Sequence, residues 1–169
     1  MKLPICLFDA KVGILCPKCE VKLKGGHITK ADVDASIKLV KLAGKYPELN
    51  RITLLRALNV NSDLVLILGA GNLAFIRKDP TLQKKLEEEL GEKLWFLEGE
   101  STDRVMLEDL FYPIRILTVN VVWLPDGSKL TKVIIPGRKT KKFPIDIEKV
   151  IKIAKEVRGI ELLVEFEKG

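Results

Sequence analysis

The chain of 169 residues has little of what catalytic sites usually need. It contains one histidine, His27, and no serine or cysteine stands in a recognisable spacing with a general base. The three consecutive glutamates at 87–89 lie on the polar side of a predicted helix, not in an isolated acidic pair. We therefore expect a protein that is not an enzyme, has no catalytic residues and takes no small-molecule substrate.

Long apolar runs are also missing. No stretch approaches the roughly 18 apolar residues that a membrane-crossing helix needs. The first residues are followed at once by Cys6 and Asp9, which is not the pattern of a secretory signal. These absences predict a cytoplasmic protein with no membrane partner, and a hydrophobic content of 47% is sufficient for packed cores.

Positive charge is in excess and is locally concentrated. The net charge is +6, which favours a polyanionic partner such as nucleic acid. Residues 129–142 contain no acidic side chain, and they carry most of the basic candidates for RNA binding. An ordinary solvated surface is the alternative interpretation. The candidates in this stretch are Lys129, Lys132, Arg138, Lys139, Lys141 and Lys142.

All three cysteines lie within the first 19 residues. Cys16 and Cys19 form a C-x2-C pair, and Cys6 and Asp9 have the same spacing. Zinc accepts thiolate and carboxylate ligands, so the pattern predicts a structural Zn²⁺ site with four protein ligands. His27 is an alternative fourth ligand. Buried, inert cysteines and a redox pair or disulfide remain open as other interpretations.

We expect an α+β protein with four segments: a zinc-ribbon-like cysteine knuckle at 1–28, a helix and linker at 29–50, and two modules at 51–100 and 101–169. Thr29 and Asp32 have the spacing of a capping box, and Gly44 is a candidate end for the helix that follows. Asp79 and Pro80 suit the start of another helix.

The two modules repeat one order of elements: strand, turn, strand, polar loop, helix and short strand. Gly91 and Gly159 hold the same place, between the charged helix and the closing strand. The first module has predicted strands at 54–60, 64–68 and 94–97 and helices at 73–77 and 81–90. The second has predicted strands at 116–124, 129–135 and 160–166 and helices at 105–111 and 147–157, with a possible short helix at 138–143.

A strand hairpin, two helices separated by a turn, and a strand is the order of a KH fold. Further signals are the C-x2-C knuckle, Phe-Ile-Arg-Lys-Asp-Pro at 75–80, Val-Trp-Leu-Pro-Asp-Gly at 122–127 and Phe-Pro-Ile-Asp at 143–146. The chain resembles the archaeal tandem-KH proteins related to the NusA transcription factors, some of which carry an N-terminal cysteine knuckle. The resemblance covers most of the chain. It implies an RNA-binding accessory protein of transcription elongation or termination, or of the ribosome, with RNA and a polymerase or ribosomal subunit as partners.

The turn between the two KH helices usually reads G-x-x-G and clamps phosphates with backbone amides. Here Arg77 and Pro80 replace the two glycines, and the second module has no glycine at the corresponding place. RNA contact in the first module would therefore rest on the side-chain charges of Arg77 and Lys78. The alternative is a protein-interaction scaffold whose KH folds have lost RNA binding.

Two tryptophans, Trp95 and Trp123, lie in apolar strand segments. Large aromatics on such strands fill cores, so we expect both to be buried. Base stacking on an exposed ring is the alternative.

Overall fold

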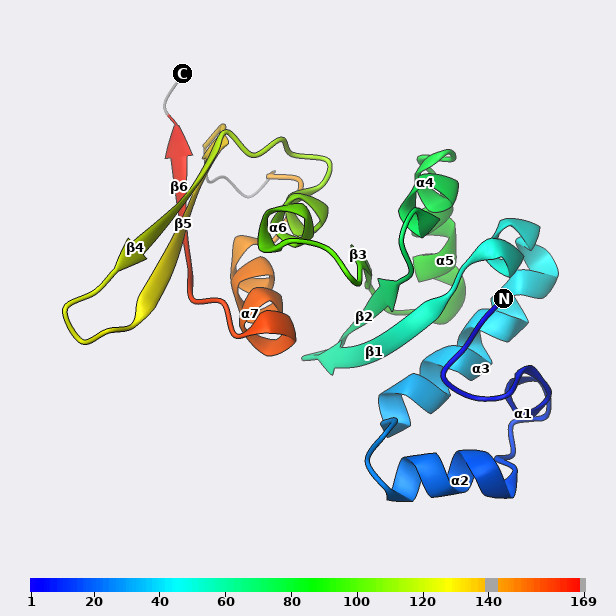
Figure 1. The fold of residues 1–169 in the computed structure, drawn as a ribbon. Helices are drawn as coiled ribbons and strands as arrows, with labels where there is room; N and C mark the ends of the chain where they lie inside the picture. Colours follow the sequence, from blue (N-terminus) through cyan, green and yellow to red (C-terminus); the bar gives the residue numbers. More distant parts are fainter. Residues whose placement is uncertain (139–142, 168–169) are drawn as a thin grey trace. The chain divides into compact units, whose positions relative to one another are not determined.

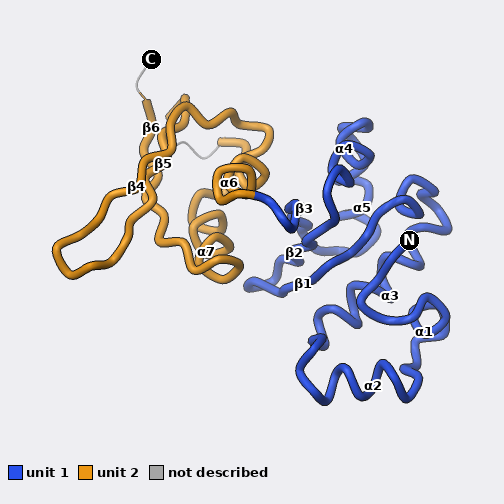
Figure 2. The backbone as a smooth tube through the Cα atoms, in the orientation of Figure 1, with its two compact units in different colours: residues 1–101 blue, residues 102–169 orange. Residues whose placement is uncertain are grey.

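The computed structural model describes residues 1–138 and 143–167. The chain forms two compact units, residues 1–101 and 102–169, each of which combines helices with a three-stranded sheet (Figures 1 and 2). The coarse prediction of an α+β protein with a cysteine cluster near its N-terminus is confirmed. Lys139, Lys141 and Lys142, predicted to contact RNA, lie outside the described residues.

Unit 1 begins with three helices: α1 (Leu7–Val12), α2 (Pro17–Lys24) and α3 (Lys30–Lys45). The cysteine-rich segment, for which we expected a ribbon-like knuckle, is thus built from two short helices. Cys6 and Cys16 are the N-cap residues of α1 and α2. A spacing of three residues fits one helical turn, and each pair spans the first turn of its helix.

Helix α3 starts as predicted and ends later than predicted. The capping box of Thr29 and Asp32 is complete, with both reciprocal hydrogen bonds formed. Gly44 is not the cap, because the helix continues to Lys45 and the chain turns at Tyr46. Tyr46 precedes the proline of η1 (Pro47–Arg51), and a residue before proline is disfavoured in helical conformation.

The predicted linker segment 29–50 is part of the core of unit 1. Ala35, Leu39 and Leu42 of α3 pack in one hydrophobic cluster with residues from the sheet and from later helices. One face of α3 is therefore buried against the unit, as the three-to-four spacing of its apolar residues indicates.

The sheet of unit 1 contains β1 (Leu54–Val60), β2 (Asp63–Leu68) and β3 (Leu94–Glu98), in that order. Strands β1 and β2 are antiparallel, whereas β2 and β3 are parallel. Every residue of the central strand β2 is buried. All three strands lie within one residue of their predicted bounds.

Two helices connect β2 to β3: α4 (Asn72–Arg77) and α5 (Leu82–Leu90). The predicted start of α5 at Asp79 and Pro80 is wrong. Asp79 accepts hydrogen bonds from the backbone N–H and the hydroxyl of Thr81, at 2.9 and 2.7 Å, which makes a turn before the helix. Thr81 is the N-cap residue, and its side chain accepts no capping hydrogen bond.

Unit 2 has a similar order of elements. Helix α6 (Asp103–Phe111) is followed by β4 (Thr118–Trp123), β5 (Lys129–Pro136), α7 (Ile147–Arg158) and β6 (Leu162–Glu167). Its sheet has the order β4-β5-β6, with an antiparallel first pair and a parallel second pair. The short helix predicted at 138–143 falls largely outside the described residues.

The predicted equivalence of Gly91 and Gly159 is confirmed. They cap α5 and α7 in the left-handed conformation, with φ of 69° and 64°. Glycine adopts this conformation at no steric cost, so both helices end where the closing strand must turn back. Among the helices that the structure describes, none is both long and apolar enough to cross a membrane.

Candidate metal centre

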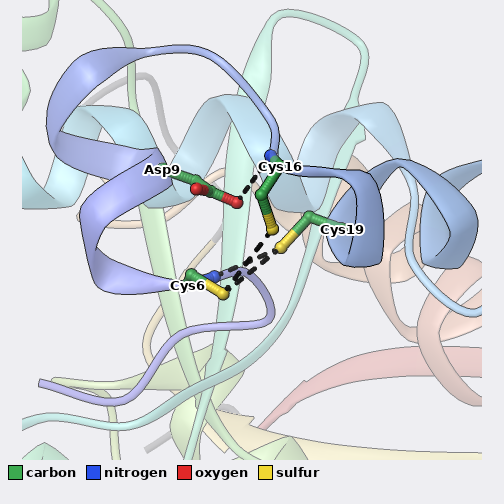
Figure 3. A group of neighbouring side chains, drawn as sticks. All are labelled: Cys6, Asp9, Cys16 and Cys19. Atoms are coloured by element: carbon green, nitrogen blue, oxygen red, sulfur yellow. Dashed lines mark hydrogen bonds between the residues drawn. The ribbon is translucent and has the colours of Figure 1, made fainter.

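The four predicted ligands lie at the beginnings of two short helices (Figure 3). Cys6 precedes α1 and Asp9 lies in its first turn, while Cys16 precedes α2 and Cys19 lies in its first turn. Residues three apart on a helix share a face, so each pair presents two side chains to the same point. Gly13 ends α1 in the left-handed conformation, with φ of 79°, and helps to turn the chain back toward the site.

The ligand atoms of Cys6, Asp9, Cys16 and Cys19 all lie within 4.8 Å of one another. The Cys6 Sγ atom is 4.0 Å from Cys16 Sγ and 3.7 Å from Cys19 Sγ. A tetrahedral centre with metal–sulfur bonds of about 2.3 Å has sulfur–sulfur edges of about 3.8 Å. The group can therefore hold a metal ion without a large rearrangement of its thiols.

His27, the alternative fourth ligand, does not belong to this group. It is exposed and lies beyond the end of α2, next to Gly25. The structure thus brings together Asp9 and the three cysteines.

Backbone amides hold two of the ligands in place. The N–H of Cys16 donates to Asp9 Oδ2 at 3.0 Å, and the N–H of Cys6 donates to Cys19 Sγ at 3.4 Å. Each bond connects one helix start to the other. Such outer contacts orient metal ligands and support the charged form of the sulfur or the carboxylate.

The pKa values of two of the candidate ligands, Asp9 and Cys19, are shifted in opposite directions. The Cys19 thiol and the Cys16 backbone N–H, which donate to Asp9, hold the pKa of that carboxyl below its usual range. Burial, assisted by the hydrogen bond to Asp9, raises the pKa of the Cys19 thiol to about 12. At neutral pH without metal, Asp9 is therefore ionised and Cys19 keeps its proton. A metal ion at this site would have to replace that proton.

The side of the site that faces the interior of unit 1 is closed to solvent. Asp9 and Cys19 are buried, and Cys19 packs with Ile5, Ala10 and Ile28 in a small hydrophobic cluster. Cys6 is exposed and Cys16 is half-buried. The outer thiols therefore face solvent, from which an ion can enter.

The predicted RNA contacts are divided between the two units. Arg77 ends α4, and Lys78 is exposed with its Nζ atom 5.9 Å from the centre of the Phe75 ring. Lys129 and Lys132 lie on β5, where Lys132 pairs with Glu165 at 3.1 Å. Arg138 is exposed just after β5.

The tryptophan prediction is confirmed for Trp95 and wrong for Trp123. Trp95 is buried, and its Nε1–H donates to Asp63 Oδ2 at 3.0 Å. Trp123 is 71% exposed. It lies two residues before the turn of the β4–β5 hairpin. Its closeness to the Pro-Asp-Gly turn was the sequence signal for exposure that the prediction did not use.

No protein-family model matches the chain, and no curated protein matches it. Among solved structures, the crystal structure of APE1850 is similar with 20% sequence identity and a TM-score of 0.45. The alignment covers 76% of this chain and 96% of that chain.

Proposed function

We propose that this protein is an RNA-binding accessory protein of a transcription or ribosomal complex. The basic character of unit 2 carries the proposal: residues 129–155 contain nine lysines and arginines and only two acidic residues. Lys129, the first residue of β5, and Arg138, two residues after its end, are exposed. Exposed cations of this kind neutralise phosphates, which supplies most of the affinity for nucleic acids.

The order of elements supports a KH-like assignment for the modules. In unit 1, two strands are followed by two helices and a strand parallel to β2. In this proposal, the residues between α4 and α5, which begin with Lys78, would correspond to the phosphate-binding turn of a KH module. Unit 2 repeats the antiparallel and parallel strand pairs.

We also propose that the metal centre binds zinc in a structural role. Three thiols and one carboxylate form a donor set that zinc accepts, and four protein ligands leave no open position for catalysis. The segment that carries them has a small hydrophobic cluster of its own. Zinc would therefore hold α1 and α2 together where apolar packing is limited.

Metal analysis of freshly purified protein tests the zinc assignment. We expect about one zinc ion per chain, from four-ligand zinc chemistry. Zinc should be lost in Cys16→Ser and retained in His27→Ala, the matched control outside the ligand group. Metal-free protein that is fully folded would contradict the assignment.

RNA binding is tested with a fluorescent single-stranded RNA and its anisotropy at 50 and 200 mM salt. A surface that neutralises several phosphates should lose affinity steeply with salt. The double variant Lys129→Glu and Arg138→Glu should bind more weakly. The control, Lys30→Glu and Lys41→Glu at exposed positions of α3, makes the same change of net charge. Absence of binding by the unmodified protein at low salt would contradict the proposal.

A second candidate function is protein interaction through the N-terminal segment. Phe8 and Ile14 are 72% and 74% exposed, which is unusual for large apolar side chains. Recovery of the tagged protein from native lysate, with and without RNase, separates the two candidates. Polymerase or ribosomal subunits that are lost after RNase indicate an RNA tether, and subunits that are retained indicate direct protein contact.

A further inference from the structure

The β4–β5 hairpin of unit 2 presents an unusual apolar surface. Figure 1 shows the hairpin (yellow) reaching beyond the other elements of this unit. Trp123 is 71% exposed, and Val121, two residues earlier on the same face of β4, is 50% exposed. Tryptophan is mostly buried in folded proteins, so an exposed ring within such a patch points to a binding surface.

The strand register places a positive charge beside the ring. Trp123 is directly opposite Lys129, and Val121 is opposite Thr131. Side chains of directly opposite residues in an antiparallel pair project from the same face and lie close together. Val122, in contrast, projects from the other face of the same strand.

The turn that carries the ring is well defined. The N–H of Leu124 donates to the Ser128 carbonyl, and the N–H of Gly127 donates to the Leu124 carbonyl, both at 2.9 Å. Asp126 accepts a hydrogen bond from the N–H of Ser128 at 2.9 Å. Gly127 has φ of 87°, which glycine adopts without strain. The indole is thus displayed on an ordered hairpin, so little conformational entropy is lost when a ligand covers it.

The positive charge of the surrounding sequence indicates the kind of ligand. Asp126 is the only acidic residue between Asp109 and Asp146, whereas the same stretch contains seven lysines and arginines. The Asp126 carboxylate is already engaged by the backbone N–H and hydroxyl of Ser128. An aromatic face beside exposed cations fits a nucleotide, whose base can stack while its phosphate meets a lysine.

We propose that Trp123 stacks on an unpaired base of single-stranded RNA while Lys129 contacts a neighbouring phosphate. This inference rests on the proposed RNA-binding function and names the form of RNA that the surface takes. Duplex RNA hides its base faces, so the hairpin should prefer single strands. Stacking tolerates every base, so little sequence preference should arise at this position.

The experiment uses the full-length protein and a fluorescent 12-nucleotide RNA without secondary structure, with a duplex of the same length for comparison. Trp123→Ala should weaken single-strand binding roughly ten- to a hundredfold, in line with the contribution of one stacked base. Trp123→Phe should retain most of the affinity. Val122→Ala, the control on the opposite face of β4, should bind as the unmodified protein does.

Tryptophan fluorescence gives an independent readout. Because Trp95 is buried, acrylamide should quench mainly Trp123, and bound RNA should protect it. Single-strand binding that is unchanged in Trp123→Ala, with quenching unaffected by RNA, would overturn the inference and leave the proposed function standing. Failure of the unmodified protein to bind RNA at low salt would overturn both.

Discussion

The carboxylate of Asp32 connects two elements of unit 1. Its Oδ1 atom accepts a hydrogen bond from the N–H of Ala57 in β1 at 2.7 Å, and its Oδ2 atom accepts one from the N–H of Thr29 at 2.8 Å. Asp32 is buried, with only 5% of the residue exposed to solvent. Asp32, the second residue of the capping box of α3, therefore also fixes the helix against the sheet.

Replacement of Asp32 should be costly. Asp32→Ala removes one of the two reciprocal bonds of the capping box, the one from the Thr29 N–H, and leaves the buried N–H of Ala57 without this partner. We therefore expect a loss of about 2–4 kcal/mol in the free energy of unfolding. Urea denaturation followed by circular dichroism measures the loss. Asp34→Ala, in the same helix at an exposed position, should stay within about 0.5 kcal/mol of the unmodified protein.

Two glycines should respond in opposite directions to alanine. Gly44 lies inside α3 with open space around the position of a Cβ atom, so Gly44→Ala should stabilise the protein by about 0.5–1 kcal/mol. Gly91 has a left-handed backbone, so Gly91→Ala should destabilise by about 1 kcal/mol. Thermal melts of both variants test this pair, and equal shifts in the same direction would contradict it.

Zinc affinity should rise with pH. The Cys19 thiol, whose pKa is raised to about 12, keeps its proton in the metal-free protein, and zinc must expel that proton on binding. Asp9, whose pKa is lowered, is already ionised and releases none. Competition titrations between pH 6 and 8, together with calorimetry in buffers of different ionisation enthalpy, measure the affinity and the released protons. An affinity independent of pH across this range would contradict the prediction.

The two tryptophans should differ in their contribution to stability. Trp95→Phe removes the buried hydrogen bond to Asp63, so it should cost about 1–3 kcal/mol in the free energy of unfolding. Trp123→Phe removes nothing from the core and should cost less than about 0.5 kcal/mol. Equal losses of stability for the two substitutions in urea denaturation would contradict the prediction that Trp95 contributes more to the folded state than Trp123 does.

Local signals predicted most of the elements. Gly91 and Gly159 mark the ends of α5 and α7, and a Pro-Asp-Gly turn marks the β4–β5 hairpin, so those elements were found with small errors at their ends. Gly44 misled the prediction because glycine can also lie inside a helix whose end is set elsewhere. There the end depends on Pro47, three residues further along.

The four candidate metal ligands were predictable as a set because the spacing of Cys6 and Asp9 repeats that of Cys16 and Cys19. The choice between Asp9 and His27 was not predictable, since it depends on how far α2 extends before the chain turns. The exposure of Trp123 could not be predicted from the strand pattern alone for a similar reason. Alternation along β4 gives the face of the sheet, but it does not give the point at which a hairpin passes beyond its covering helix.

Strand β4 has a further consequence for the behaviour of the protein in solution. Within the described residues it is an edge strand, paired with β5 on one side, and its sequence Thr-Val-Asn-Val-Val-Trp contains no lysine or proline. Edge strands usually carry such residues because an unprotected edge recruits strands from other molecules. Concentrated protein should therefore aggregate through this edge, and a lysine in place of Val121 or Val122 should improve solubility.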